Sequence, residues 1–535
     1  MTKEKDSDDF LDNGAQLHEH PEWQSLDNIS LILQVQYGEW WLPLSRRYEW
    51  RLDEYAEEKL DQLKPLVNFR KGPADYLRNN TSMAPSESAK VKNFRATQAE
   101  AENMVFCGRP YSAFWVIPPT LLCPQFSQFV IDLDSCTPST QDIGLFHDLC
   151  QEMSDIFDNK FNRNGQFIDI LKEYGFSDLD RGYIGQYPCD GRLKVYINKA
   201  HRDAIYCILE VKNEIPNVSS EPMAQAIFYW LEAVRIMIGG KDNQFLTNFP
   251  AVLLLHYGES CPICLFIYIT FSTGPYISVA LAVYTGIANV QIMTPVFPLH
   301  FHPSDAKARA TGERFICALR RLLFDLKNYY LTAAFSEQPL LQPQFPFYNR
   351  YTDGVTTHRF VYEEQIDLKR AFIAHLEDNP KDKIFVKFAL CYGEDAHKTM
   401  HAHGFAPKLR AVERFADGWV MAVMDDVSHQ YCWMQKPLKK KAYEAAEKAL
   451  ALLHKDGYVH GDVRETNIMV KRDGVDKEGL RDIILVDFDW AGKENTVRYP
   501  SNITLKHPDI PRPESVERGG LISSAHDVEM LRLLS

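Results

Sequence analysis

The chain lacks a long uninterrupted hydrophobic run, although 45% of its 535 residues are hydrophobic. No charged side chain occurs from Ser260 to Val296, but proline and glycine residues divide that stretch. Its longest apolar run, Ile263 to Thr270, is far shorter than the roughly 20 residues that a membrane-spanning helix needs. β-branched and aromatic side chains at Cys264–Ile269 and Tyr276–Val283 instead predict two buried strands. We therefore expect no membrane partner.

The sequence also has neither a disulfide framework nor an excess of positive charge. Its 11 cysteines are scattered without regular spacing, and no hydrophobic signal segment follows Met1. These absences predict an intracellular location, cytoplasmic or nuclear. The formal net charge of −13 argues against a generally basic surface for nucleic acid or membrane, although a local basic groove stays open.

Length and composition favour more than one domain. No internal repeat is present, and the polar stretch from Gly72 to Lys92 is expected to be a loop. We expect an N-terminal helical and loop region at residues 1–112 and an α/β domain at 113–335. A linker rich in proline and glutamine is expected at 336–346, and a final two-lobed domain at 347–535.

The most specific motif lies near the C-terminus. Residues 460–467 read H-G-D-V-R-E-T-N, and residues 487–489 read D-F-D after an apolar run. Phosphoryl transfer requires a residue that orients the attacking hydroxyl, ligands for magnesium, and positive charge at the phosphates. We predict that Asp462 orients the attacking hydroxyl and that Asn467 and Asp487 are the ligands of magnesium.

A lysine within an apolar, strand-like segment supplies the positive charge. Lysine is seldom buried without a partner, so we expect Lys387 to hold the phosphates of ATP. Its ion-pair partner is expected on the following helix, with Glu394 and Asp395 as the two alternatives. The strand that ends at Met424 and Asp425 is expected to place backbone groups against the base of the nucleotide.

These motifs resemble the kinase-like domains abundant in fungi, which are similar in turn to aminoglycoside and choline kinases. The resemblance rests on V-K-F at 386–388, on H-G-D-V-R-x-x-N, and on V-D-F-D-W-A-G and V-R-Y-P, and it covers about residues 347–535. It implies a compact two-lobed fold that transfers phosphate from ATP, with magnesium, to serine or threonine of an unknown protein substrate. A pseudokinase that binds ATP to switch an interaction is the alternative.

The chain departs from ordinary protein kinases at several positions. Gly461 stands where an arginine is usual, and Asp489 replaces the glycine of D-F-G. No G-x-G-x-x-G precedes Lys387, which leaves Gly354 as the candidate tip of a phosphate-covering hairpin. The segment His526–Leu531 resembles the helix whose aspartate braces the catalytic loop. These departures predict an enzyme that is not activated by phosphorylation of a loop.

A second group of residues suggests a different chemistry. Glu210 and Lys212 lie two residues apart on a strand-like segment, so both side chains point to the same face. Asp190 precedes them, and Gln225 and Tyr229 share one face of a predicted helix. In metal-dependent hydrolysis of phosphodiesters, two carboxylates hold magnesium or manganese, and a lysine positions the attacking water.

This second pattern resembles the PD-(D/E)-x-K nuclease fold in its RecB-type variety, and the order of the two domains resembles that of Crinkler-type effectors. The resemblance implies a nucleic acid that the first domain cleaves or merely binds, with Glu152 as a candidate third acid. The fold class expected for the whole chain is α+β, with a restriction-endonuclease-like α/β domain followed by a compact two-lobed protein-kinase-like domain.

Overall fold

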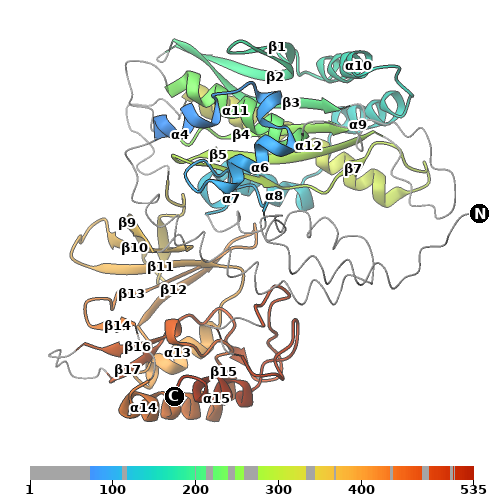
Figure 1. Ribbon diagram of the computed structural model, residues 1–535. Helices are drawn as coiled ribbons and strands as arrows, with labels where there is room; N and C mark the ends of the chain where they lie inside the picture. Colours follow the sequence, from blue (N-terminus) through green and yellow to red (C-terminus); the bar gives the residue numbers. More distant parts are fainter. Residues whose placement is uncertain are drawn as a thin grey trace, which may run out of the picture.

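The computed structural model has two halves, each built around its own sheet (Figure 1). The fold is mixed α+β, as expected. Within the described residues, no helix is both long enough and apolar enough to cross a membrane. The described residues are 73–110, 117–198, 201–212, 221–238, 247–257, 275–332, 344–366, 369–433, 438–472, 481–505, 510 and 512–535.

The first half holds a seven-stranded sheet in the order β1-β2-β3-β4-β5-β6, with β7 paired to β5. Strands β3 and β4 are parallel, and the other pairs are antiparallel. The strands are β1 (Asp180–Ile184), β2 (Tyr187–Ile197), β3 (Arg202–Lys212), β4 (Ala251–Tyr257), β5 (Tyr276–Tyr284), β6 (Ala288–Ile292) and β7 (Phe297–Pro298).

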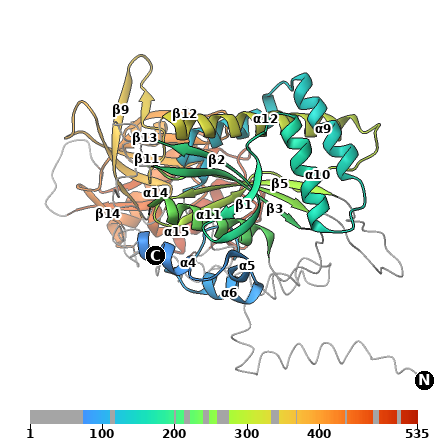
Figure 2. The same cartoon turned by 90° about the horizontal axis from the view of Figure 1, so that it is seen from above.

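Helices cover both faces of this sheet. Seen from above, α11 lies on one side of the strands and the long helix α12 on the other (Figure 2). Almost every side chain of α11 is buried, as expected of a helix enclosed on all sides. The helices are α4 (Pro73–Asn80), α5 (Pro85–Ser88), α6 (Val91–Ala99), α7 (Pro119–Leu122), α8 (Pro124–Ser135), α9 (Thr140–Met153), α10 (Lys160–Glu173), α11 (Pro222–Ile238) and α12 (Ala306–Thr332).

Two expectations about the first half have different outcomes. The strand predicted at Tyr276–Val283 is confirmed as β5, whereas Cys264–Ile269 lies outside the described residues. The loop predicted from Gly72 to Lys92 is wrong, because α4 and α5 occupy most of it. Tertiary contact explains the error, since the buried Tyr76 hydroxyl donates to the carbonyl of Met104 at 3.1 Å.

The second half begins with a six-stranded antiparallel sheet in the order β12-β13-β11-β10-β9-β8. Helix α13 (Glu394–Ala402) follows β11 in the chain. The strands are β8 (Arg350–Thr352), β9 (Thr357–Gln365), β10 (Ala371–Leu376), β11 (Lys383–Ala389), β12 (Leu409–Arg414) and β13 (Val420–Asp425).

The rest of the second half combines two helices with short strand pairs. Strands β14, β16 and β17 form a three-stranded sheet, and β15 pairs with β18. The elements are β14 (Tyr431–Trp433), α14 (Lys440–Lys455), β15 (Tyr458–Val459), the 3-10 turn η4 (Glu465–Asn467), β16 (Ile468–Lys471), β17 (Ile483–Leu485), β18 (Gly492–Lys493) and α15 (Ser524–Arg532).

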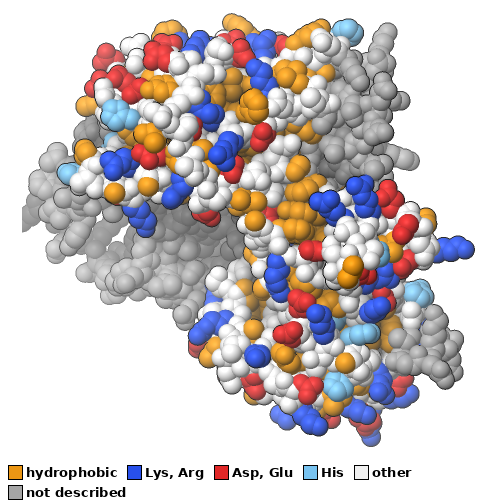
Figure 3. Space-filling view, turned by 180° about the vertical axis from the view of Figure 1, so that it is seen from behind, with side chains coloured by type: hydrophobic (Ala, Val, Ile, Leu, Met, Phe, Trp, Pro, Cys, Tyr) orange, Lys and Arg blue, Asp and Glu red, His pale blue; other side chains and the backbone are white. Residues whose placement is uncertain are grey.

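The six-stranded sheet forms a wall between two hydrophobic cores. Because side chains alternate along a strand, Val386 and Phe388 of β11 join the core of the first half. Phe385 faces the core formed by α13, α14 and α15, which is the face that also carries Lys387. Seen from behind, hydrophobic side chains gather at the waist between the halves (Figure 3). The first half therefore covers the outer face of this sheet.

Polar contacts fix the same junction. The indole Nε1 of Trp419, in the turn before β13, donates to Thr120 Oγ1 at 3.2 Å. Ser127 of α8 donates to Asp417 Oδ2 at 2.7 Å. The backbone N–H of Phe347 donates to the carbonyl of Leu121 at 3.0 Å. These bonds tie α7 and α8 to the sheet that carries Lys387.

Candidate functional site

The loop that carries H-G-D is held from below by α15. The Asp527 carboxylate is fully buried and accepts the backbone N–H groups of His460 and Gly461, each at 2.7 Å. Its Oδ2 also lies 3.0 Å from His454 Nε2. The prediction that this helix braces the loop is consistent with these bonds. Such charge-assisted bonds to backbone fix the loop geometry.

Gly461 has a positive φ of 79°, a conformation that side chains rarely adopt. A Cβ atom at this position would lie 2.9 Å from Ile522 Cδ1. An arginine here would therefore strain the backbone and disturb the core beneath it. The glycine is a requirement of this local packing.

Asp462 and Asn467 are brought together by the turn η4. Asn467 Nδ2 donates to Asp462 Oδ2 at 2.8 Å and to the Asp462 carbonyl at 2.9 Å. Both side chains are buried. Arg464 Nε also donates to Asp462 Oδ2, at 3.1 Å. The predicted hydroxyl-orienting acid and one predicted metal ligand thus share a site.

Asp487 stands directly beyond the strand that pairs with the Asn467 segment. Val486 N donates to the Asn467 carbonyl at 3.0 Å, so the two predicted metal ligands come from adjacent backbones. Asp487 has a positive φ of 68°. Strained conformations of this kind in residues other than glycine concentrate at functional sites.

Lys387 pairs with two carboxylates of the D-F-D turn. Its Nζ lies 2.5 Å from Asp487 Oδ1 and 2.8 Å from Asp489 Oδ1. Burial opposes ionisation of Asp487, but the attraction of Lys387 outweighs it and lowers its pKa to about 2. Burial, together with the charge of Asp487, raises the pKa of Asp489 to about 7. Two acids therefore compete for one cation.

The expected partners of Lys387 on α13 are wrong. Glu394 lies 2.7 Å from Lys398 Nζ and 3.5 Å from Arg414 Nη2, and Asp395 is exposed. The start of the helix is fixed elsewhere, because Gly393 N donates to the Phe488 carbonyl at 2.8 Å. Both acids thus occupy the first turn of α13, where the helix dipole favours them, while the D-F-D turn supplies the partners.

Met424 and Asp425 end β13, as the sequence suggests. The side chain of Met424 is buried in the core on the Lys387 face. The carboxylate of Asp425 accepts a hydrogen bond from Arg410 Nε at 2.6 Å. The backbone N–H of Asp425 donates to the Lys408 carbonyl at 3.0 Å. The backbone of Met424 thus stays a predicted contact for the nucleotide base, whereas the carboxylate and N–H of Asp425 already have partners.

The expected role of Gly354 is wrong because its turn lies at the end of the sheet away from Lys387. Gly354 has a positive φ of 84° in the turn between β8 and β9, two strands away from β10 and at the opposite end from Lys387. The turn beside Lys387 joins β9 to β10, since Ala371 at the start of β10 pairs with Lys387.

Arg370, which the motifs did not reveal, ends that turn. Its Nε donates to the Phe388 carbonyl at 3.3 Å, and its guanidinium lies 5.5 Å from the centre of the Trp419 ring. Burial lowers its pKa, which attraction to Asp489 and Asp487 opposes. A cation thus stands at the turn that lies beside Lys387. The signal in the sequence is the pair of basic residues before β10.

The second group of predicted residues also converges. Asp190 on β2 accepts the N–H of Val211, between Glu210 and Lys212, at 2.8 Å. Lys212 Nζ lies 2.9 Å from Glu210 Oε1 and donates to Gln225 Oε1 at 2.8 Å. Burial and the charge of Asp190 raise the pKa of Glu210 to about 7. On the same helix as Gln225, the Tyr229 hydroxyl donates to the carbonyl of Pro188.

A lysine that the motifs did not reveal lies beside the two carboxylates of this group. Lys160, the first residue of α10, has its Nζ 2.6 Å from Asp190 Oδ2 and 3.8 Å from Glu210 Oε1. Glu152 does not join them, because it is on α9 and accepts from Gln166 Nε2 at 3.4 Å. The candidate third acid is therefore wrong, since α10, and not α9, faces the two carboxylates.

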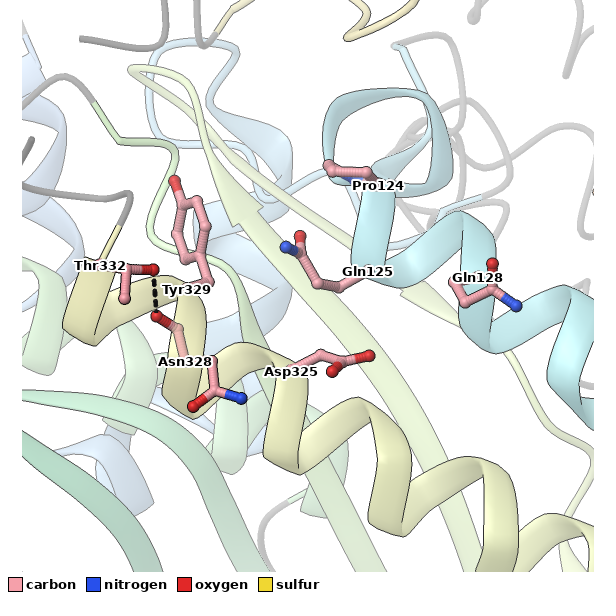
Figure 4. Close-up of a pocket in the computed structure, with 7 residues that line it drawn as sticks. All are labelled: Pro124, Gln125, Gln128, Asp325, Asn328, Tyr329 and Thr332. Atoms are coloured by element: carbon pink, nitrogen blue, oxygen red, sulfur yellow. Dashed lines mark hydrogen bonds between the residues drawn. The ribbon is translucent and has the colours of Figure 1, made fainter. Parts of the chain in front are cut away.

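No described part of the chain gathers three or more histidine, cysteine or carboxylate side chains into a metal site. A hollow of about 380 Å³ lies between α8 and α12 (Figure 4). Its lining includes Gln125, Asp325 and Asn328, and it contains none of the predicted site residues.

Comparisons with known proteins add only a likeness of fold. No protein-family model matches the sequence, and no curated protein matches it. Solved structures that are similar to part of it include two kinases. The kinase PK-1 of the Cydia pomonella granulovirus is 17% identical over 30% of this chain and 60% of its own, with a TM-score of 0.24. Vaccinia related kinase 3 is 15% identical over 34% of this chain and 64% of its own, with a TM-score of 0.25.

Both are named as kinases, and the matched region spans less than two thirds of either one. At such scores the likeness carries no argument about activity. The contacts among Lys387, Asp462, Asn467 and Asp487 are the firmer basis for a function.

Proposed function

We propose that the chain is an ATP- and magnesium-dependent phosphotransferase of the serine/threonine protein kinase type. One observation carries the proposal: Lys387 pairs with Asp487 at 2.5 Å, and the N–H of Val486, next to Asp487, donates to the Asn467 carbonyl at 3.0 Å. Asn467 in turn donates to Asp462 at 2.8 Å. Positive charge, metal ligands and a hydroxyl-orienting acid therefore belong to one connected site, which is what phosphoryl transfer requires.

The donor set suits a magnesium ion. Carboxylate and amide oxygens are the ligands that magnesium prefers, and Asp487 and Asn467 provide both kinds. The two acids Asp487 and Asp489 both contact Lys387, so a metal ion at Asp487 would face two carboxyl groups. Bound magnesium would neutralise charge on the phosphates of ATP.

The residues of the chain then have separate tasks. Lys387 binds phosphate oxygens, and Arg370 adds positive charge on the same side. Asp462 accepts a hydrogen bond from the attacking hydroxyl and orients it for in-line attack. Asn467 holds the carboxylate of Asp462 in place through its amide nitrogen, while its oxygen is available to the metal.

A thermal shift experiment tests the nucleotide site. ATP with magnesium is expected to raise the Tm of the wild type and of Asp462→Ala, and to leave the Tm of Asp487→Ala unchanged. The proposal fails if neither nucleotide nor metal stabilises the wild type. Transfer from γ-labelled ATP then separates a kinase from a pseudokinase, because a pseudokinase shows the shift without transfer.

We propose a second, independent function for the first half, a metal-dependent nuclease or a nucleic-acid-binding module. Its support is that Lys212 Nζ lies 2.9 Å from Glu210 Oε1 on β3, and that Asp190 on the neighbouring strand β2 accepts the N–H of Val211 at 2.8 Å. The residues fit a magnesium or manganese ion once Lys160 is displaced. Incubation with plasmid and manganese tests it, with Lys212→Ala as control. Identical products from the two proteins would contradict cleavage.

A further inference from the structure

Arg512 contacts the catalytic aspartate from outside the catalytic loop. Its Nη2 lies 2.9 Å from Asp462 Oδ1, and the two side chains are only 4% and 7% exposed. The other carboxylate oxygen, Oδ2, already accepts from Asn467 and Arg464. The oxygen that remains for an incoming hydroxyl therefore has an arginine beside it.

The position of Arg512 does not depend on this contact alone. Its Nε donates to the carbonyl of Thr504 at 3.0 Å, and its guanidinium lies 5.1 Å from the centre of the Trp490 ring. Arg512 lies in the loop between Arg498 and Leu521, and an antiparallel β-bridge joins these two residues. These contacts hold the guanidinium beside Asp462 independently of the ion pair.

An acceptor that binds Asp462 therefore meets the buried positive charge of Arg512. Arginine remains protonated in proteins, and a buried charge that loses its partner is costly. A neutral acceptor that shares Oδ1 with Arg512 gives the guanidinium no additional partner. An acceptor with a carboxylate or phosphate beside its hydroxyl adds a partner, and the planar guanidinium can bind such a group through two parallel hydrogen bonds.

We propose that Arg512 is a specificity-determining residue that selects serine or threonine acceptors with an anionic group next to the hydroxyl. The inference rests on the proposed phosphotransfer at Asp462. It names the class of protein substrate as acidic segments, in which the anion is an aspartate, a glutamate or a residue already phosphorylated. The shared chemistry is an oxyanion within reach of Arg512.

Serine peptides that differ at a single neighbouring position test this selection. The neighbour is glutamate, phosphoserine, glutamine or lysine, and the full chain transfers phosphate from γ-labelled ATP with magnesium. For the wild type, kcat/KM is expected to be about tenfold or more higher with glutamate than with glutamine, as for other hydrogen bonds to charged groups. Phosphoserine against glutamate shows which anion is preferred.

Two variants at Arg512 and one control variant are compared with the wild type on the same peptides. Arg512→Gln is expected to bring the ratio between the glutamate and glutamine peptides close to one, mainly through a higher KM for the glutamate peptide. Arg512→Lys keeps the charge but cannot form two parallel bonds, so an intermediate ratio is expected. Arg518→Gln, in the same loop, is the matched control and should retain the wild-type ratio.

Each other result overturns the proposal. An equal gain of Arg512→Gln on all four peptides would identify Arg512 as an inhibitory plug. An unchanged ratio in both Arg512 variants would make the contact merely structural. A wild type that is stabilised by ATP and magnesium but phosphorylates no peptide would exclude the acidic acceptor class while leaving the nucleotide site intact. Absence of that stabilisation would instead contradict the proposed function itself.

Discussion

Lys387 and Asp487 form an ion pair across 100 residues of sequence, with Nζ 2.5 Å from Oδ1. The lysine belongs to the six-stranded sheet, and the aspartate follows β17 beside the catalytic loop. The pair therefore links the sheet, whose outer face is covered by the first half of the chain, to the loop that carries Asp462. Predictions about the nucleotide site begin with this link.

Replacing Lys387 removes the cation that forms ion pairs with both Asp487 and Asp489. Lys387→Met is expected to lower kcat/KM for phosphate transfer about 100-fold or more, the scale of losing one preorganised charge. It should also abolish the rise in Tm with ATP and magnesium. Lys383→Met, on the same strand but paired with Glu363, is the control and should keep most activity. Equal losses in the two variants would contradict the role of Lys387.

Asp527 is predicted to hold the catalytic loop without touching substrate. Asp527→Asn replaces one acceptor oxygen by a donor next to two backbone N–H groups, and we expect a loss of about 2–3 kcal/mol in the free energy of unfolding. The expected drop in kcat exceeds any change in KM for ATP. Glu529→Gln on the exposed face of α15 is the control. Urea unfolding and steady-state kinetics check both, and wild-type behaviour of Asp527→Asn would refute the brace.

Lys160 is predicted to compete with a divalent cation for Asp190 and Glu210. Because its ammonium lies 2.6 Å from Asp190, Lys160→Met should tighten manganese binding by about tenfold, a modest change since the lysine is partly exposed. Lys172→Met, near the other end of α10, should bind manganese as the wild type does. Calorimetric titration of the full chain measures the affinities. Weaker binding by Lys160→Met would show that the lysine is not a competitor.

His256 is predicted to make the first half sensitive to acid. Its ring stacks on Phe167 at 4.5 Å and its Nδ1 donates to the Tyr276 carbonyl at 3.1 Å. Burial, with the nearby charge of Arg163, lowers its pKa to about 3. The folded chain thus binds fewer protons than the unfolded chain below the usual pKa of about 6.5. Stability is therefore retained above that pH and declines as the pH falls toward 3.

The variant His256→Gln isolates this effect. The wild type should lose about 2 kcal/mol of unfolding free energy relative to His256→Gln between neutral pH and about pH 5. Other titrating groups are common to both proteins and cancel in the difference. Chemical denaturation at several pH values provides the measurement. A difference that stays constant with pH would mean that His256 is protonated in the folded state or exposed.

Local sequence patterns predicted the elements that depend on local structure. The helix expected to carry Gln225 and Tyr229 is α11, and the strands expected at Lys387 and at Met424–Asp425 are β11 and β13. The H-G-D loop was also readable, because its residues lie within one short turn. What these segments have in common is that burial of one stripe or face is visible in the spacing of their apolar residues.

Contacts between distant segments could not be read in this way. The partner of Lys387 depends on where the start of α13 is fixed by Phe488, and the place of Gly354 depends on strand β8. Arg512 and Lys160 approach their carboxylates from 50 and 30 residues away in sequence. No local spacing encodes such approaches, so only the tertiary arrangement reveals them.

The central claim is that Asp462 orients a hydroxyl for attack on ATP. Single-turnover transfer from γ-labelled ATP to the glutamate-flanked serine peptide tests it most directly, with wild type and Asp462→Asn compared at saturating magnesium. We predict that Asp462→Asn still binds ATP, as shown by an unchanged rise in Tm, but transfers phosphate at least about 100-fold more slowly. Equal transfer rates in the two proteins would contradict the account.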